Sequence, residues 1–317
     1  MKLLTWEDEP SGRRIGKLCG FRVLSLRHYA RARCLKRQGA SVLIIRVPSA
    51  IDGIFSHFTH NLGWMRWASE RGHRSYVDMR TPLNIFNREG PVDFNPWELF
   101  FKQSCGPLDV LNARTALTTD CGQPDFPGVF LDLYDQDSEA FRGWRRFTHE
   151  NIALADSMAR MVESRHAELF GNDDRVLGCL VRGTDYTAMR PSHHPVQPTP
   201  QQVIADAKRI CAERGMRKVF LATEDRDVRE MFAQAFGSSL IVSQTERPAY
   251  KADLLANSGA RGDLARTIEI STQYLVSIAL LARCRCLLAG CTSGTMGAAL
   301  LSDGYEVMQV YKLGYYP

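Results

Sequence analysis

Short apolar runs alternate with amphipathic stretches along the second half of the chain. The runs are apolar at nearly every position, as strands buried on both faces are. Thr199 and Pro200 mark one helix start, because Thr is a favoured cap and Pro fits the first helical position. The alternation predicts a parallel sheet with helices on its faces. The predicted strands are 176–181, 218–222, 240–242, 286–289 and 306–310, and the predicted helices are 200–214, 227–236, 263–283 and 293–301.

The first half begins with a similar unit and then loses its periodicity. We predict a strand at 42–47, a turn in which Gly53 takes a positive φ, a helix at 55–71 ending near Gly72, and a strand at 75–78. Residues 80–132 are irregular and rich in Pro, Gly and aromatic residues, and a segment of this length is usually functional. One long helical stretch is expected from 137 to 170.

The length of the chain favours more than one domain. A chain of 317 residues exceeds what one hydrophobic core usually serves. We expect a basic helical segment at 1–40, an α/β domain at 41–170 and a Rossmann-like domain at 171–317.

The segment 13–37 carries nine Lys and Arg residues and no acidic residue, with apolar residues interleaved. A basic amphipathic helix can bind an anionic membrane surface. We favour the alternative, a solvated helix that covers the body of the protein, and keep peripheral membrane contact through 13–37 as the other interpretation.

Composition narrows the class of protein. The net charge is +5, which suits an anionic small ligand but is too weak to argue for nucleic acid. The nine cysteines are scattered and show no CxxC pair, so a disulfide framework or a structural zinc site is not expected. The first residues lack the apolar core of a signal peptide, and no run is long enough to span a bilayer. These features predict a cytoplasmic protein.

Three predicted strands in the second half end in residues that carry chemistry. Ligands of open α/β sheets bind beyond the carboxyl ends of the strands, so such residues are candidates for a common site. An arginine there suits phosphate oxygens, and a turn with hydroxyls before a helix can cradle an anion. The residues are Arg182 and Asp185 after the first strand, Thr223, Glu224 and Asp225 after the second, and Thr292, Ser293, Gly294 and Thr295 after the fourth.

Each of these signals also has a plainer interpretation. Arg182 could pair with Asp185 at the surface, Glu224 or Asp225 could cap the next helix, and the glycine turn could serve close packing. The proline-rich loop 189–198 lies where a lid or a sugar contact would be. His57 and His60 lie three residues apart on a predicted helix with no third ligand nearby, so we expect no metal site. What favours a nucleotide site is the convergence of an arginine, a carboxylate pair and an anion turn at one sheet edge.

Residues 41–317 resemble the inverting fucosyltransferase superfamily, which includes nodulation α-1,6-fucosyltransferases and protein O-fucosyltransferases. The resemblance rests on Arg182-Gly183-Thr184-Asp185 after a strand, on Ala222-Thr223-Glu224-Asp225, and on Thr292-Ser293-Gly294-Thr295. Asp52-Gly53-Ile54-Phe55-Ser56 resembles the glycine turn that faces the cleft in this superfamily. Two departures are Leu180 in place of a histidine and Gly183 one position early. The chain also resembles bacterial proteins of capsule and polysaccharide synthesis.

The resemblance implies an α/β, GT-B-like fold with two Rossmann-type domains, the donor on the second and the acceptor between them. It implies a metal-independent glycosyltransferase that takes a GDP-sugar, with GDP-fucose as the candidate donor, and inverts its configuration, the acceptor being a bacterial surface glycan. Arg182 would neutralise the leaving diphosphate, and Asp52, His57 or Asp185 would be the acceptor base. The remaining residues from the three strand ends would bind the nucleotide. A non-catalytic nucleotide- or glycan-binding protein is the alternative.

Overall fold

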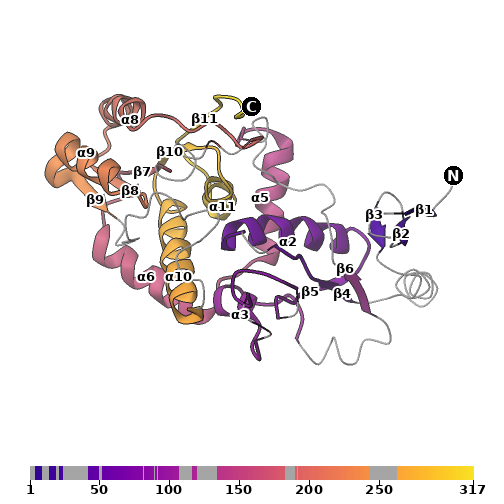
Figure 1. Cartoon of the computed structure of the whole chain (residues 1–317). Helices are drawn as coiled ribbons and strands as arrows, with labels where there is room; N and C mark the ends of the chain where they lie inside the picture. Colours follow the sequence, from indigo (N-terminus) through magenta and orange to yellow (C-terminus); the bar gives the residue numbers. More distant parts are fainter. Residues whose placement is uncertain are drawn as a thin grey trace.

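The computed structural model describes two parallel sheets with helices packed on and between them (Figure 1). Side chains are described for residues 42–49, 52–80, 82–88, 90, 92–106, 119, 134–182, 190, 192–242 and 263–317. The backbone is described in addition for 4–8, 14–18, 21–23 and 116–118.

The second half of the chain forms a five-stranded parallel sheet in the order β11-β10-β7-β8-β9. All five strands were predicted within a residue or two at each end, because each is an apolar run. Three of them, β7, β8 and β10, are buried along almost their whole length. Their bounds are Val176–Leu180 (β7), Lys218–Ala222 (β8), Leu240–Val242 (β9), Cys286–Gly290 (β10) and Val307–Tyr311 (β11).

Helices cover both faces of this sheet. Side chains of Leu177, Cys179 and Val181 pack with α8 and α9 on one face, whereas Val176 and Leu180 belong to the core shared with α6, α10 and α11. The chain therefore winds away from β7 in two directions, first through α8 and α9 and then through α10 and α11. The bounds are Asp156–Leu169 (α6), Pro200–Arg214 (α8), Arg226–Phe236 (α9), Leu264–Leu281 (α10) and Ser293–Leu301 (α11), with a 3-10 turn, η2, at Gly237–Ser239.

The first half builds a smaller parallel sheet in the order β5-β4-β6. Helix α2 packs on it and ends near Gly72, which has a positive φ of 71° as a helix stop. Gly53 does not take the positive φ that we expected, because its φ is −74° as the N-cap of α2. The bounds are Val42–Ile45 (β4), Ile54–Ser69 (α2), Arg74–Val77 (β5), Pro96–Phe100 (α3) and Ala116–Thr119 (β6).

The long helix expected at 137–170 is two helices, α5 (Glu139–Asn151) and α6. The helical structure is interrupted between α5 and α6 because the backbone there hydrogen-bonds to residues at the end of α3. The Lys102 N–H donates to Ala153 O at 2.8 Å, and the Ala155 N–H donates to Phe100 O at 2.9 Å. Helix α6 then packs against α10, and the adjoining Phe170 ring meets Phe220 of β8 at 5.3 Å between centroids.

The prediction of a helix through the basic segment is wrong where the structure describes it. Residues Arg14–Leu18 (β2) and Phe21–Val23 (β3) form antiparallel strands with Leu4–Asp8 (β1). Interleaved basic and apolar residues suit one face of a helix and one face of a strand alike, so composition did not distinguish the two.

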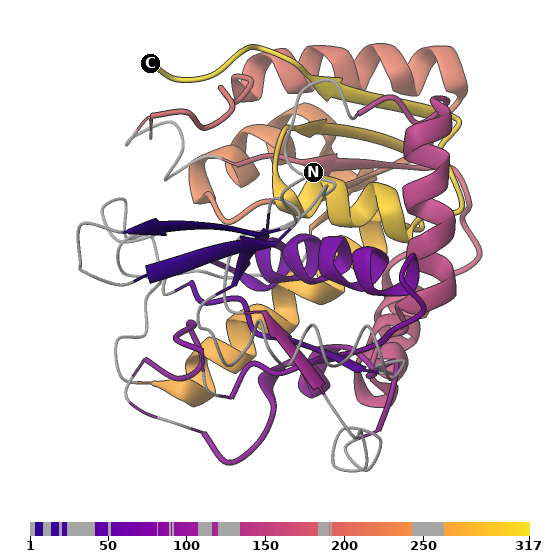
Figure 2. The same ribbon diagram turned by 90° about the vertical axis from the view of Figure 1, so that its right-hand side faces the viewer.

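The two sheets share one hydrophobic core. Helices α2 and α11 lie side by side in both views (Figures 1 and 2), and the core runs from Ile45 and Phe58 to Leu287 and Ala299. The contact is close because Gly297 has no side chain. A Cβ there would lie 2.2 Å from Cδ1 of Phe55.

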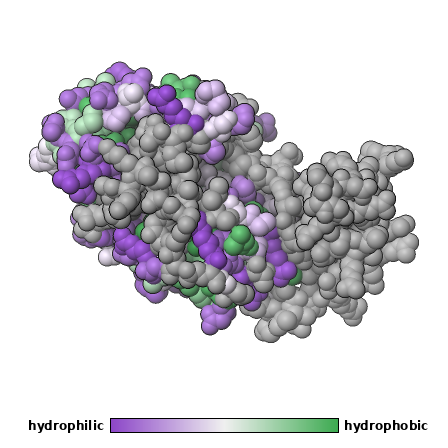
Figure 3. Space-filling view, in the orientation of Figure 1, coloured by the Kyte–Doolittle hydropathy of each residue, from purple (hydrophilic) through white to green (hydrophobic). Residues whose placement is uncertain are grey.

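On the side drawn in Figure 3, the residues that the structure describes are mostly hydrophilic, with separate small apolar areas. The large exposed apolar side chains include Leu83, Met161 and the neighbouring pair Leu313 and Tyr315. Among the described helices, none combines the length and the hydropathy needed to cross a bilayer.

A Gly297→Ala substitution should loosen the contact between α2 and α11. The added methyl would displace the buried Phe55 ring, and overpacking of this kind costs about 1–3 kcal/mol in the free energy of unfolding. The matched control is Gly143→Ala on α5, where nothing lies within 4 Å of the new Cβ. There we expect a gain of up to about 1 kcal/mol from helix propensity. Urea denaturation measures both, and equal effects would contradict the packing argument.

Candidate functional site

The order of strands in the larger sheet reverses between β7 and β10. Strands β8 and β9 lie on one side of β7 with their helices on one face, and β10 and β11 lie on the other side with helices on the opposite face. In open α/β sheets, ligands bind at the carboxyl ends of the strands where the order reverses. Arg182 follows β7, and the turn Cys291–Thr292 follows β10. The reversal therefore falls between two of the strand ends that the sequence singled out.

The structure also brings the third strand end to this place. Leu180 pairs with both Ala289 and Ala222 in the parallel register, and the Val181 N–H donates to Ala222 O at 3.1 Å. Arg182 thus lies level with Glu224 on one side and with Cys291 on the other. The predicted convergence of three strand ends at one sheet edge is confirmed as geometry.

Arg182 forms an ion pair, with Glu224 as its partner. The distance from Nε to Oε1 is 3.4 Å, and the side chains are only 13% and 7% exposed. These two atoms make no hydrogen bond to each other. The pair differs from the Arg182–Asp185 pair that we had considered, and Asp185 itself lies outside the described residues.

Thr223 and Asp225 support the local backbone. The Thr223 hydroxyl accepts from the Asp225 N–H at 3.2 Å. Asp225 caps α9, because its carboxylate accepts from the N–H groups of Asp227 at 2.8 Å and Val228 at 3.2 Å. The capping interpretation therefore applies to Asp225, whereas Glu224 faces Arg182.

The Thr292–Thr295 turn is held by its own hydroxyls. Thr292 caps α11 by accepting from the Thr295 N–H at 3.1 Å, and the buried Thr295 hydroxyl donates to Gly290 O at 2.5 Å. Gly294 serves packing, because a Cβ there would lie 2.1 Å from the hydroxyl of Tyr274. Of the hydroxyls predicted to bind phosphate here, Ser293 is the one that is only half-buried.

Two helix N-termini meet at Ser293. Its Oγ lies 3.3 Å from Oγ of Ser56, which is in the first turn of α2. Neither α2 nor α11 has an acidic residue in its first turn. Each helix carries a partial positive charge at its N-terminus, so two such ends side by side repel each other unless an anion lies between them. Asp52, just before α2, is the nearest carboxylate in the sequence, and it is half-buried.

His57 follows Ser56 and is 1% exposed, with no hydrogen-bond partner for either ring nitrogen. Burial lowers the pKa of His57 to about 4, and the nearby Asp52 only partly opposes this. His57 is therefore neutral at physiological pH and closed off from an acceptor. His60, one turn further on, also has a lowered pKa because of burial.

The loop 189–198, which we expected to act as a lid, is hydrogen-bonded to other segments where the structure describes it. The His193 N–H donates to Tyr316 O at 3.0 Å, and the Val196 N–H donates to Gly314 O at 2.9 Å, so the segment pairs with the last residues of the chain. Gln197 donates to Cys291 O at 3.1 Å and so joins the loop to the turn after β10.

Comparison with solved structures gives the same fold as that of known fucosyltransferases. NodZ alpha-1,6-fucosyltransferase soaked with GDP-fucose has a TM-score of 0.50 and 16% identity, covering 83% of this chain and 93% of NodZ. The fucosyltransferase NodZ from Bradyrhizobium has a TM-score of 0.50 and 15% identity over the same shares. POFUT1 in complex with GDP-fucose has a TM-score of 0.50 and 8% identity, covering 87% of this chain and 98% of POFUT1.

The chain has a GT-B-like fold. The α/β architecture with parallel sheets that we predicted is confirmed, and so is the resemblance to the fucosyltransferase superfamily at the level of fold. No protein-family model matches the sequence, and no curated protein matches it. Among the described residues, no cluster of three or more His, Cys, Asp or Glu is arranged to hold a metal ion.

His57 should make the stability of the protein depend on pH. The unfolded chain takes up a proton at His57 below a pH of 6.5, whereas the folded protein does so only near pH 4. The free energy of unfolding should therefore fall as the pH is lowered between these values, by about 3 kcal/mol from this residue.

Urea denaturation from pH 7 to pH 4.5 measures this dependence. His57→Gln should flatten it, and His149→Gln, at a more exposed histidine, should leave it as it is. The burial argument is wrong if the slope is the same in the His57 variant and in the unmodified protein.

Proposed function

We propose that this protein is a glycosyltransferase that takes a GDP-sugar, with a fucose-like sugar, and transfers the sugar to a glycan acceptor with inversion. The observation that carries the proposal is the meeting of the N-termini of α2 and α11 beside Arg182 at the reversal of strand order. Arg182 follows the strand next to the one that leads into α11, and three such sources of positive potential would suit the two phosphates of a nucleoside diphosphate. The likeness in fold to enzymes solved with GDP-fucose supports this class of donor.

The chemistry is a single displacement. The acceptor hydroxyl oxygen bonds to the anomeric carbon as the bond from that carbon to the diphosphate oxygen breaks, and the hydroxyl proton passes to a carboxylate. Negative charge grows on the leaving diphosphate, where Arg182 and the first N–H groups of α11 stabilise it. Among the described candidates for the base we favour Asp52, because it is half-buried beside the α2 N-terminus. His57 is sealed in the core.

Glu224 has a defined part in this scheme. It holds Arg182 in the absence of donor and gives it up when the diphosphate arrives, and its freed carboxylate then faces the nucleoside. Ser293 and Ser56 approach the phosphates from the two halves of the chain. We further propose that the acceptor is a bacterial surface glycan and that transfer takes place in the cytoplasm without a metal ion.

Removing Arg182 should abolish most of the turnover. Arg182→Ala alone would leave Glu224 as a buried carboxylate without its charged partner, so the informative variant is Arg182→Ala combined with Glu224→Gln. We expect its kcat for transfer from GDP-fucose to fall on the order of a hundredfold or more, because the leaving charge is no longer neutralised. Glu224→Gln alone is the comparison, and it should lose less turnover than the double variant because it keeps the guanidinium of Arg182. An equal loss in both variants would contradict the role of Arg182.

Donor choice can be read from thermal unfolding. A ligand that binds only the folded protein raises the melting temperature, and at a concentration of about 100 Kd the stabilisation is about 2.7 kcal/mol. In a panel of nucleoside diphosphates and their sugar conjugates, we expect GDP and GDP-fucose to give the largest shifts. Slow hydrolysis of the bound GDP-sugar would separate an enzyme from a binding protein. No shift with any nucleotide would refute the proposal.

A further inference from the structure

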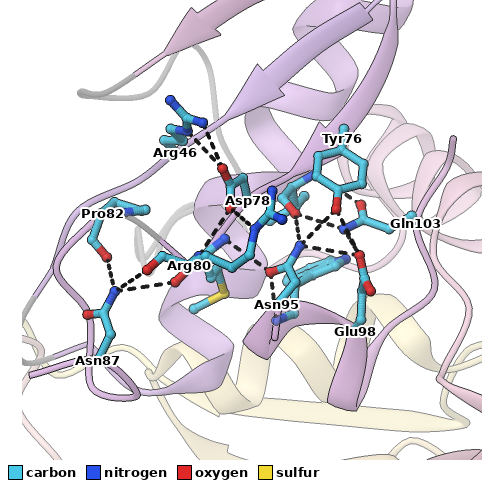
Figure 4. A network of polar contacts seen from close by, with 12 residues as sticks. Arg46, Tyr76, Asp78, Arg80, Pro82, Asn87, Asn95, Glu98 and Gln103 are labelled. Carbon is cyan, nitrogen blue, oxygen red and sulfur yellow. Dashed lines mark hydrogen bonds and ion pairs between the residues drawn. The ribbon is translucent and has the colours of Figure 1, made fainter. Parts of the chain in front are cut away.

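A buried carboxylate in the smaller sheet is held by two arginines. Asp78 follows β5 and is 1% exposed, and it lies between Arg46 and Arg80 in Figure 4. Its Oδ2 accepts from Nε of Arg46 at 2.9 Å and lies 2.8 Å from Nη2 of the same residue. Its Oδ1 accepts from Nε of Arg80 at 2.9 Å and from the Arg80 N–H at 3.1 Å. Both oxygens of one carboxylate are thus satisfied by two guanidinium groups.

Two guanidinium groups share the one carboxylate of Asp78. Burial by itself would raise the pKa of Asp78, but the hydrogen bonds from Arg80 and Arg46 outweigh it and lower that pKa, so the carboxylate is ionised. The side chain of Arg80 is 43% exposed and that of Arg46 is 33% exposed. Arg80 faces Asp78 through Nε, which leaves the two terminal nitrogens of its guanidinium for an oxyanion.

One other carboxylate, Glu98, lies in the same network. Its Oε1 accepts from the hydroxyl of Tyr76 at 3.0 Å and from Gln103 at 3.1 Å. Figure 4 shows it on the far side of Asn95 from Arg46. Uncharged groups donate hydrogen bonds to Glu98, and its negative charge also acts on Arg80, where it helps to raise the pKa of the guanidinium.

The loop that carries Arg80 is held rigidly. The buried side chain of Asn84 donates to Met79 O at 2.7 Å, and that of Asn87 donates to Arg80 O at 2.9 Å. Asn95 accepts from the Met79 N–H at 3.1 Å and donates to Val77 O at 2.6 Å. A loop fixed by three buried amides presents the guanidinium of Arg80 in one place, which lowers the entropy cost of binding a ligand there.

The cluster lies on the rim next to the candidate donor site. Arg46 and Asp78 follow β4 and β5, so both lie at the carboxyl edge of the smaller sheet, the edge from which α2 begins. The loops after these strands touch, because the Ser49 N–H donates to Leu83 O at 2.7 Å. The N-terminus of α2 leads from this edge directly to the contact between Ser56 and Ser293.

We infer that Arg80, supported by Arg46 and Asp78, binds an oxyanion carried by the acceptor glycan, either a carboxylate or a phosphate. That the ligand is an acceptor rests on the proposed function, but the binding of an oxyanion at Arg80 does not. A single arginine paired with Asp78 would be enough to connect the residues that follow β4 and β5. The second arginine, half-exposed on a rigid loop at the rim of the site, selects acidic glycans over neutral ones.

Calorimetric titration without any nucleotide tests this inference. The probes are tetragalacturonate, its neutral methyl ester and galactose 6-phosphate, and the two acidic probes separate a carboxylate from a phosphate as the group bound. The unmodified protein should bind at least one acidic probe about tenfold or more tightly than the ester, as a charge-assisted hydrogen-bond pair allows. Arg80→Gln should remove this preference. Arg226→Gln, at an arginine that is 76% exposed on α9, should keep it.

Arg80→Lys keeps the charge and serves as the second variant, since Arg80→Gln leaves Asp78 with one partner. Thermal unfolding should show that Arg80→Lys is folded. This variant should still bind the acidic probes more weakly than the unmodified protein, because it lacks the planar guanidinium fork. The inference is overturned if no acidic probe binds, if the ester binds equally well, or if Arg80→Lys and every folded Arg80→Gln sample keep full affinity. Because the titration contains no nucleotide, failure of the GDP panel would leave its result standing, and the reverse also holds.

Discussion

The arrangement of the whole molecule depends on the reversal of strand order between β7 and β10. Because the chain leaves β7 on one face and returns on the other, the turns after these two strands separate toward opposite layers. That separation places Arg182 and the start of α11 on either side of one point. The smaller sheet then brings the start of α2 to the same point through Ser56. A polar site with several fixed dipoles thus follows from topology before any particular side chain is considered.

Several polar groups near the candidate site are in arrangements that are electrostatically unfavourable when each is considered alone. Two helix ends of the same sign lie together, and an arginine is held by a carboxylate without a hydrogen bond between Nε and Oε1. An imidazole and an amide on α2, those of His57 and Asn61, are buried without partners. Each arrangement costs folding free energy by itself. Natural proteins tend to keep such departures from good packing and pairing near functional sites.

Much of the second half could be predicted from the sequence, because fully buried strands leave runs such as Val176–Leu180 that have few other interpretations. The basic segment could not, since periodicity within it was ambiguous and nothing local signals an antiparallel sheet. Helix α3 carried a readable sign in the cap Asn95 before Pro96. The pairing of Arg182 with Glu224 and of Ser56 with Ser293 joins distant residues, so no local pattern contains it. Arg46 and Asp78 also follow strands, but the predicted strands 42–47 and 75–78 included them, so the rule that found Arg182 passed over them.

The shared core between the sheets has a mechanical consequence. Enzymes built from two lobes often capture their substrates by a hinge, but here Phe55 packs against Gly297 within a core that both sheets share, and opening the lobes would expose that packed apolar surface to water. We therefore expect a ligand to enter through movements of side chains and loops. Such small rearrangements are fast, so we expect that no slow movement of whole lobes limits the pace of the proposed catalytic cycle.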